Sequence, residues 1–201
     1  ARFQLITTGK ISQKSLLFEN QHIERLIKAS RYFSYPFDAE YLKKKIEEEC
    51  RACDINQDYR LRISLSKSGK IELSRQILTP LTPTFCKAKI CLQEANLQQA
   101  FTYFKTTHRP HLSLGEQEKI YHNTKGELLE TSIGNLVLKI AGKLYTPPIR
   151  LGILPGIYRQ HLLETGQVEE KVLTLADLAQ AEAIYGCNAV RGLYELSMKE
   201  N

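Results

Sequence analysis

The chain has 201 residues, of which 42% are hydrophobic and 25% are charged, and 28 basic against 22 acidic residues give a net charge of +6. This is the composition of one folded domain or of two small ones, and it excludes a wholly disordered chain. No run reaches the ~18 apolar residues of a membrane span and no signal peptide opens the chain, so we expect a cytoplasmic protein without membrane contact. The first residue is alanine, from which we expect a trimmed start or a chain cut from something longer.

The first half of the chain is predicted to contain both strands and helices, as in an α+β domain. Pro36 ends the first helix, and Asp38 is a good N-cap for the second. Strands are predicted at 3–8, 15–19, 59–66, 70–77 and 84–92, and helices at 20–33 and 38–52. A turn at 67–69 joins two of the strands as a hairpin. We therefore predict a smaller N-terminal domain of residues 1–95.

Residues 94–99 are polar and lack strand signals, so we predict an inter-domain linker at 96–100. The second domain, residues 101–201, is predicted to consist mainly of strands with glycine and proline turns between them. Strands are predicted at 101–105, 119–123, 127–131, 137–140, 144–146 and 184–188, and helices at 156–165 and 175–181. Thr174 is the predicted N-cap of the last helix.

The positive charges are not arranged as a nucleic-acid-binding surface. The lysines at 43–45 are followed directly by the glutamates at 47–49, which is typical of a solvated helix face with i,i+4 ion pairs. The other basic residues are scattered, without interleaved aromatic rings. We therefore expect no nucleic-acid partner, and a surplus of cations also suits a small anionic substrate.

The five cysteines are an odd number, which fits a reducing compartment better than a complete set of disulfides. Cys50 and Cys53 form a CxxC pair in a charged helical stretch, not at the strand-to-helix turn that a thioredoxin-like motif needs. Cys86 and Cys91 are separated by four residues, outside the usual spacing of a zinc site. We expect buried or incidental thiols and no metal site.

Four features of the second half suggest chemistry. Lys105 ends a predicted strand, and Glu130 lies on the outgoing strand of a hairpin. A loop at 151–156, marked by glycine and proline, opens a helix whose N–H groups suit a phosphate. Asn188 and Ala189 close a late strand. Each feature is weak alone, because a lysine at a strand end is usually a solvated charge.

The order and spacing of these features resemble the class IV aminotransferase superfamily, the fold-type IV enzymes that use pyridoxal 5'-phosphate. That superfamily has a cofactor-bonded lysine, then a Glu-x-x-x-x-Asn segment, a Gly-Ile helix start and a turn of small residues. The matching residues here are Lys105, Glu130 with Asn135, Gly156 with Ile157, and Asn188 with Ala189. The resemblance implies an α+β fold of two domains, similar to D-amino acid aminotransferase, with an N-terminal α/β sandwich-like domain and a C-terminal pseudo-barrel.

Within that superfamily the chain is most similar to aminodeoxychorismate lyase, in particular to the lyase domain of fused para-aminobenzoate synthases. The similar stretches are Lys-Thr-Thr-His-Arg at 105–109, Gly-Ile-Leu-Pro-Gly-Ile-Tyr-Arg at 152–159, Thr-Leu-Ala-Asp-Leu at 174–178 and Cys-Asn-Ala-Val-Arg-Gly-Leu at 187–193. Leu-Ile-Thr-Thr at 5–8 resembles the lyase strand whose threonine faces the cofactor. The resemblance implies a lyase of folate biosynthesis that converts 4-amino-4-deoxychorismate to 4-aminobenzoate and pyruvate.

The resemblance also implies roles for single residues. Lys105 would bond to the cofactor and act in catalysis together with Thr8, while Glu130 would pair with the pyridine nitrogen. The other expected cofactor contacts are Arg25, which lies in a His-x-x-Arg-Leu segment, and Asn135, Gly156, Ile157, Asn188 and Ala189. For the two substrate carboxylates we expect Arg62, Arg109 and Arg191, because guanidinium groups match carboxylates with two parallel hydrogen bonds. A homodimer and a functional link or fusion to aminodeoxychorismate synthase are implied as well.

Two alternatives remain open on the sequence. The first is an amino acid aminotransferase of the same fold, of the branched-chain or D-amino acid type, which differs in needing a 2-oxo acid acceptor. The second is a catalytically silent domain that supports a larger synthase or a dimer partner, because a fold does not by itself guarantee a function.

Overall fold

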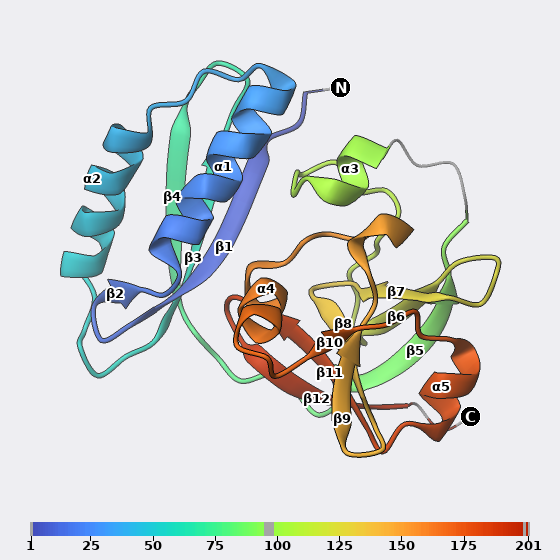
Figure 1. Ribbon diagram of the computed structural model, residues 1–201. Coiled ribbons are helices and arrows are strands. Elements are labelled where there is room, and N and C mark those ends of the chain that lie inside the picture. The colour runs from blue at the N-terminus through green and yellow to red at the C-terminus, as the bar shows by residue number, and fades with distance from the viewer. Residues whose placement is uncertain (1, 95–98, 199, 201) are drawn as a thin grey trace. The chain divides into compact units, whose positions relative to one another are not determined.

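A computed structural model describes residues 2–94, 99–198 and 200 (Figure 1). The chain forms two compact units, one of Ala1–Pro80 with Phe104–Arg109 and the other of Leu81–Tyr103 with Pro110–Asn201. This division places residues 81–94 with the second unit, unlike the domains 1–95 and 101–201 predicted from the sequence. Of the predicted linker at 96–100, residues 96–98 lie outside the described residues and the last two begin a helix.

The first unit contains one antiparallel sheet with two helices. The strands lie in the order β2 (Ser15–Leu16), β1 (Leu5–Ser12), β3 (Tyr59–Leu65) and β4 (Ile71–Ile77). Helices α1 (Glu19–Phe33) and α2 (Ala39–Arg51) pack side by side on the sheet (Figure 1). The shared core is formed by buried aliphatic side chains, among them Leu5, Leu26, Leu42, Ile46, Leu61 and Ile63. Both helices and the hairpin of β3 and β4 were predicted from the sequence and are confirmed.

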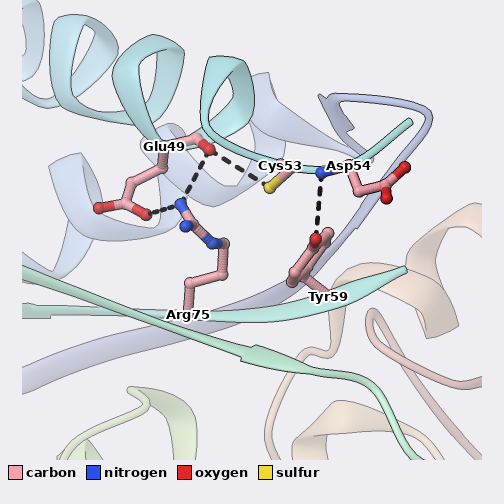
Figure 2. Close-up of polar contacts among 5 residues, drawn as sticks. All are labelled: Glu49, Cys53, Asp54, Tyr59 and Arg75. Carbon is pink, nitrogen blue, oxygen red and sulfur yellow. Dashed lines mark hydrogen bonds and ion pairs between the residues drawn. The ribbon is translucent and has the colours of Figure 1, made fainter. Parts of the chain in front are cut away.

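Polar contacts hold the two ends of α2. At the start, the Asp38 side chain accepts a hydrogen bond from the backbone N–H of Tyr41 at 3.0 Å, which confirms the predicted N-cap. At the other end, Arg75 of β4 donates to the Glu49 carbonyl at 3.0 Å and pairs with the Glu49 carboxylate (Figure 2). The Asp54 N–H also donates to the Tyr59 hydroxyl at 3.0 Å, which ties the segment after the helix to β3.

The second unit is built on a sheet that closes on itself. Among the described residues its strand order is β10 (Glu169–Glu170), β9 (Lys143–Thr146), β8 (Asn135–Ile140), β11 (Ala183–Asn188), β12 (Gly192–Met198), β5 (Lys87–Leu92), β6 (Lys119–His122) and β7 (Leu128–Thr131). A further pairing of β7 with β8, at Glu130 and Asn135, closes the sheet. The predicted C-terminal pseudo-barrel and the two-part α+β fold class are confirmed.

Four short helical segments accompany this barrel: α3 (Gln99–Tyr103), the 3-10 turn Ile149–Leu151, α4 (Ile157–Glu164) and α5 (Leu175–Gln180). The predicted cap of the last helix is confirmed, because Thr174 and Asp177 form a reciprocal capping box. Within the described residues, no helix is both long and apolar enough to cross a membrane.

Three predictions about elements need correction. The strand predicted at 101–105 is wrong, because residues 99–103 are helical and the Thr102 hydroxyl donates to the Gln99 carbonyl at 2.8 Å. Aromatic and β-branched residues favour strands only weakly and in context, so their presence did not fix the structure of this segment. The strand β12 was not predicted. The strand β5 was assigned to the first domain, but it pairs with β12 and β6 of the second unit.

Candidate active site

The segment around Lys105 is fixed against β1 of the first unit's sheet. The Lys105 carbonyl accepts a hydrogen bond from the Ile6 N–H at 3.0 Å, and the Thr107 N–H donates to the Gln4 carbonyl at 2.9 Å. Between them, Thr106 forms a β-bridge with Leu5. These contacts add a short pairing along the part of β1 that β2 does not cover. They fix the backbone on both sides of Lys105.

The Lys105 amine is half-buried among cations. Its pKa lies well below the ordinary value, first because of burial and then because of the charges of Arg25, Arg109, Arg60 and Arg62. Both causes disfavour the charged ammonium. An amine with a lowered pKa loses its proton more readily than an ordinary surface lysine, and the neutral amine can act as a nucleophile or accept a proton.

Arg25 points from α1 toward this cluster and is held by two buried side chains. Its Nη1 donates to the Thr7 hydroxyl at 3.4 Å, and that hydroxyl lies 2.6 Å from Nδ1 of His22. The pKa of Arg25 is lowered to about 10 by burial and by Arg109, so the guanidinium stays charged at neutral pH. Burial, Arg25 and Lys105 lower the pKa of His22 to about 3, so the imidazole is neutral.

Thr8 and Arg62 lie on the same face of the sheet, because they are direct partners in the pairing of β1 with β3. Thr7, the next residue along β1, points to the opposite face and contacts His22 of α1. Arg60 precedes Arg62 by two residues and therefore shares its face. The first unit thus places Arg25, Arg62 and Arg109 near Lys105, together with Arg60, which the sequence analysis did not single out. Thr8 lies opposite Arg62 in the sheet.

In the second unit, Glu130 and Asn135 hold the loop that precedes α4. Both side chains are 2% exposed. The Glu130 Oε1 accepts a hydrogen bond from the Leu154 N–H at 3.3 Å, and the Asn135 amide donates to the Leu154 carbonyl at 2.8 Å. Leu154 contributes only backbone atoms to these contacts, so no side-chain pattern in the sequence could have identified it.

Gly156 lies against Asn135 at the start of α4. A Cβ atom at this position would meet the Asn135 side-chain oxygen, so the close approach requires glycine. The Gly156 N–H already donates to the Leu154 carbonyl at 2.9 Å. Among the described residues, no side chain caps α4, and the N–H groups of its first turn, beginning at Ile157, suit an anion.

Asn188 builds the turn that follows β11. Its side-chain oxygen accepts from the N–H groups of Val190 and Arg191 at 3.0 and 2.8 Å, and its amide donates to the Ile133 carbonyl at 3.0 Å. Ala189 is buried within this turn. Arg191 lies in the second unit near Tyr194 and Cys86, and burial lowers its pKa. The predicted substrate arginines are therefore divided, with Arg62 and Arg109 in the first unit and Arg191 in the second.

Taken one unit at a time, the donor groups fit single chemical groups of pyridoxal 5'-phosphate. The lysine amine suits an aldehyde, the arginine suits a phosphate, and the buried carboxylate of Glu130 suits a protonated ring nitrogen. Across the described part of the chain, no group of three His, Cys, Asp or Glu side chains could hold a metal ion.

Comparison with known proteins gives a match over almost the whole chain. The family model described as amino-transferase class IV matches residues 4–197. A protein of Haemophilus influenzae with no stated function is 33% identical over 79 residues, and this match spans 39% of the present chain and 41% of the relative.

Solved structures of similar fold include both aminotransferases and a lyase. A candidate amino-acid aminotransferase from Mesorhizobium loti has a TM-score of 0.84 and 26% identity, covering 98% of this chain and 100% of that one. A 4-amino-4-deoxychorismate lyase from Pseudomonas aeruginosa has a TM-score of 0.73 and 19% identity, covering 98% and 84%. A hypothetical aminotransferase from Mycobacterium tuberculosis, with alpha-ketoglutarate and PMP bound, has a TM-score of 0.77 and 18% identity, covering 97% and 80%.

Proposed function

Because the chain belongs to the amino-transferase class IV family, we propose that it is a pyridoxal-phosphate-dependent lyase that converts 4-amino-4-deoxychorismate to 4-aminobenzoate and pyruvate. The superfamily expected from the sequence is confirmed, and its cofactor is confirmed at the level of the family. The reaction, the substrate and the roles of single residues form the proposal.

The observation that carries the proposal is the environment of Lys105. Its amine is half-buried, its pKa is well below the ordinary value, and the charges acting on it are those of four arginines. An amine of this kind can bond to an aldehyde and, once released, can accept a proton from a substrate carbon. The same arginines attract an anionic cofactor and an anionic substrate.

Bound pyridoxal phosphate would supply an electrophilic carbon and a ring that takes up electrons from the substrate. We assign Lys105 to the bond with that carbon and to the proton at the substrate carbon that bears nitrogen. The Glu130 carboxylate would keep the ring nitrogen protonated. Opposite unit charges about 4 Å apart attract by roughly 4 kcal/mol at an effective dielectric near 20.

The remaining cofactor contacts would hold the phosphate and its surroundings. Arg25 supplies positive charge, and the neutral pair of Thr7 and His22 fixes its guanidinium. From the second unit we assign backbone N–H groups near Gly156 and Ile157, and the turn of Asn188 and Ala189, with Asn135 supporting the loop.

The substrate carries two carboxylates, which calls for two cationic contacts. We assign Arg62 and Arg109, which lie near Lys105, and Arg191 as a third candidate. Thr8 shares a face with Arg62, and we propose that its hydroxyl delivers a proton as pyruvate leaves. We further propose that the enzyme works as a homodimer in the cytoplasm, with a functional link or fusion to aminodeoxychorismate synthase.

A second candidate is an amino acid aminotransferase. It is favoured by one observation, the TM-score of 0.84 and 26% identity to the candidate aminotransferase from Mesorhizobium loti. The lyase is favoured by the four sequence stretches at 105–109, 152–159, 174–178 and 187–193. Both candidates share Lys105, Glu130 and Arg25, so the two reactions must be distinguished by their products.

A coupled assay distinguishes them. Chorismate, glutamine and aminodeoxychorismate synthase are supplied with the purified protein and pyridoxal phosphate, and 4-aminobenzoate and pyruvate are measured. Equal amounts of both products without a 2-oxo acid support the lyase. Amine transfer that requires a 2-oxo acid, with no 4-aminobenzoate, contradicts it. Stoichiometric cofactor binding without either reaction indicates a silent domain.

A further inference from the structure

Glu118 is a buried carboxylate that none of the roles above uses. It directly precedes β6 in the second unit and is 0% exposed. A carboxylate can remain inside a protein only when hydrogen-bond donors compensate for the loss of water. The partners of Glu118 therefore show what the charge does there.

Three donors surround the Glu118 carboxylate. Its Oε1 accepts from the backbone N–H groups of Lys119 at 2.9 Å and Ser132 at 3.0 Å, and its Oε2 accepts from the Tyr194 hydroxyl at 3.3 Å. Burial, together with the Glu118 charge, raises the pKa of Tyr194 well above the ordinary value, so the phenol remains protonated and donates. Of these contacts, the hydrogen bond from Ser132 links Glu118 to the turn between β7 and β8.

Ser132 lies in the tight turn between β7 and β8. The Thr131 N–H donates to the Gly134 carbonyl at 2.9 Å, and the Gly134 N–H donates to the Thr131 hydroxyl at 3.0 Å. Tyr194 lies directly beside this turn, since a Cβ atom on Gly134 would come within 2.8 Å of its hydroxyl. Glu118 and Tyr194 thus support the turn from one side.

The two ends of the same turn carry Glu130 and Asn135. These residues are direct partners across β7 and β8, and both bind the backbone of Leu154. A displacement of Ser132 would therefore be transmitted over two residues to Glu130 and on to Leu154.

We propose that Glu118 is a positioning residue that holds the β7–β8 turn and thereby fixes the Glu130 carboxylate. The inference rests on the proposed function, in which Glu130 pairs with the ring nitrogen of the cofactor. Tyr194 assists by donating to Glu118 and by limiting its movement.

The direct test is amide hydrogen exchange of the full chain, with and without pyridoxal phosphate, in Glu118→Gln and Tyr194→Phe. In Glu118→Gln the side chain keeps an oxygen that can accept from Ser132, but it loses the negative charge. Tyr194→Phe removes only the hydroxyl that donates to Glu118. We expect exchange at the Leu154 N–H to become about tenfold faster in both, while the amides of β11 keep their rates. Glu127→Gln is the matched control at the opposite end of β7, where Glu127 accepts from Asn123, and it should leave Leu154 unchanged.

A second readout separates positioning from mere support of the fold. Glu130 does not bind the substrate in the proposed function, so the two variants should lower kcat about tenfold with little change in KM. Glu118→Ala removes the acceptor of the Lys119 and Ser132 N–H groups, so it should be more severe than Glu118→Gln.

Unchanged exchange at Leu154 in both variants, or equally faster exchange throughout the barrel, would overturn the proposal. A fall in kcat confined to Glu127→Gln would do so as well. The exchange result needs no substrate. If the chain makes no 4-aminobenzoate, the proposed function fails. The rate of hydrogen exchange at the Leu154 N–H still decides whether Glu118 holds the turn.

Discussion

Replacing Gly156 by alanine tests the contact network around Leu154. Gly156 has φ −64° and ψ 145°, values that alanine adopts without strain. The added Cβ would instead meet the side-chain oxygen of Asn135. Asn135 is 2% exposed, and its side-chain N–H donates to the Leu154 carbonyl. The alanine can be accommodated only if the Asn135 carboxamide moves and this hydrogen bond is lost.

The expected cost follows from that single bond. A lost hydrogen bond costs about 1 kcal/mol net, and the buried Asn135 amide left without its acceptor adds about 1–3 kcal/mol. We therefore expect Gly156→Ala to lower the free energy of unfolding by about 2–4 kcal/mol, measured by urea unfolding. Affinity for pyridoxal phosphate should fall as well, because the start of α4 and Glu130 are both connected to Leu154.

Two controls make this prediction decisive. Gly115→Ala introduces a Cβ that meets only the end of the Lys119 side chain at 3.9 Å, so its effect on stability should be near zero or slightly favourable. In an Asn135→Ala background, Gly156→Ala should cost at least about 1 kcal/mol less than in the wild type, because the clash is already removed. Additive costs for the two substitutions would refute the reasoning.

Three further predictions concern other parts of the first and second units. Arg75→Ala should lower the free energy of unfolding by about 1 kcal/mol, because it removes both bonds to Glu49, whereas Arg51→Ala removes only an exposed ion pair and should change it little. Thr174→Ala should cost about 1 kcal/mol in urea unfolding through loss of the capping box, and Thr174→Ser should restore most of it. His22 has a pKa of about 3 in the folded chain and 6.5 in the unfolded chain. Between these pH values only the unfolded state binds the extra proton, so the free energy of unfolding falls as the pH drops from 6.5 toward 3. His22→Gln should reduce this slope by up to about 1.4 kcal/mol per pH unit, and an unchanged slope would contradict the neutral state of His22.

The elements with strong local signals were predictable from the sequence. The helices α1 and α2 have buried residues at helical spacing, and Asp38 and Thr174 cap helices through bonds to residues three positions away. Such interactions lie within one or two turns of the chain, where sequence patterns are informative.

The features that were missed depend on residues far apart in the sequence. The strand β5 pairs with β12, more than 100 residues later, and nothing local to β5 indicates that partner. The helix α3 replaces a strand expected from aromatic residues, because strand preference depends on tertiary context more than on residue type.

The candidate site shows the same division. The side chains named by the resemblance, including Lys105, Glu130 and Arg25, lie in the two clusters described above. Arg60 could have been added from its period-two spacing with Arg62. Leu154 could not have been identified from its side chain, because its contacts use only backbone atoms. Nothing in the sequence distinguishes the buried Glu118 from a surface glutamate.

The central claim is that Lys105 bonds to pyridoxal phosphate, and one measurement tests it most directly. The purified protein is incubated with the cofactor, reduced with borohydride, digested with trypsin and analysed by mass spectrometry. The account predicts a stoichiometric mass increase on the single peptide that contains Lys105, and none in Lys105→Ala. A modification spread over exposed lysines, or an unmodified Lys105, would contradict it.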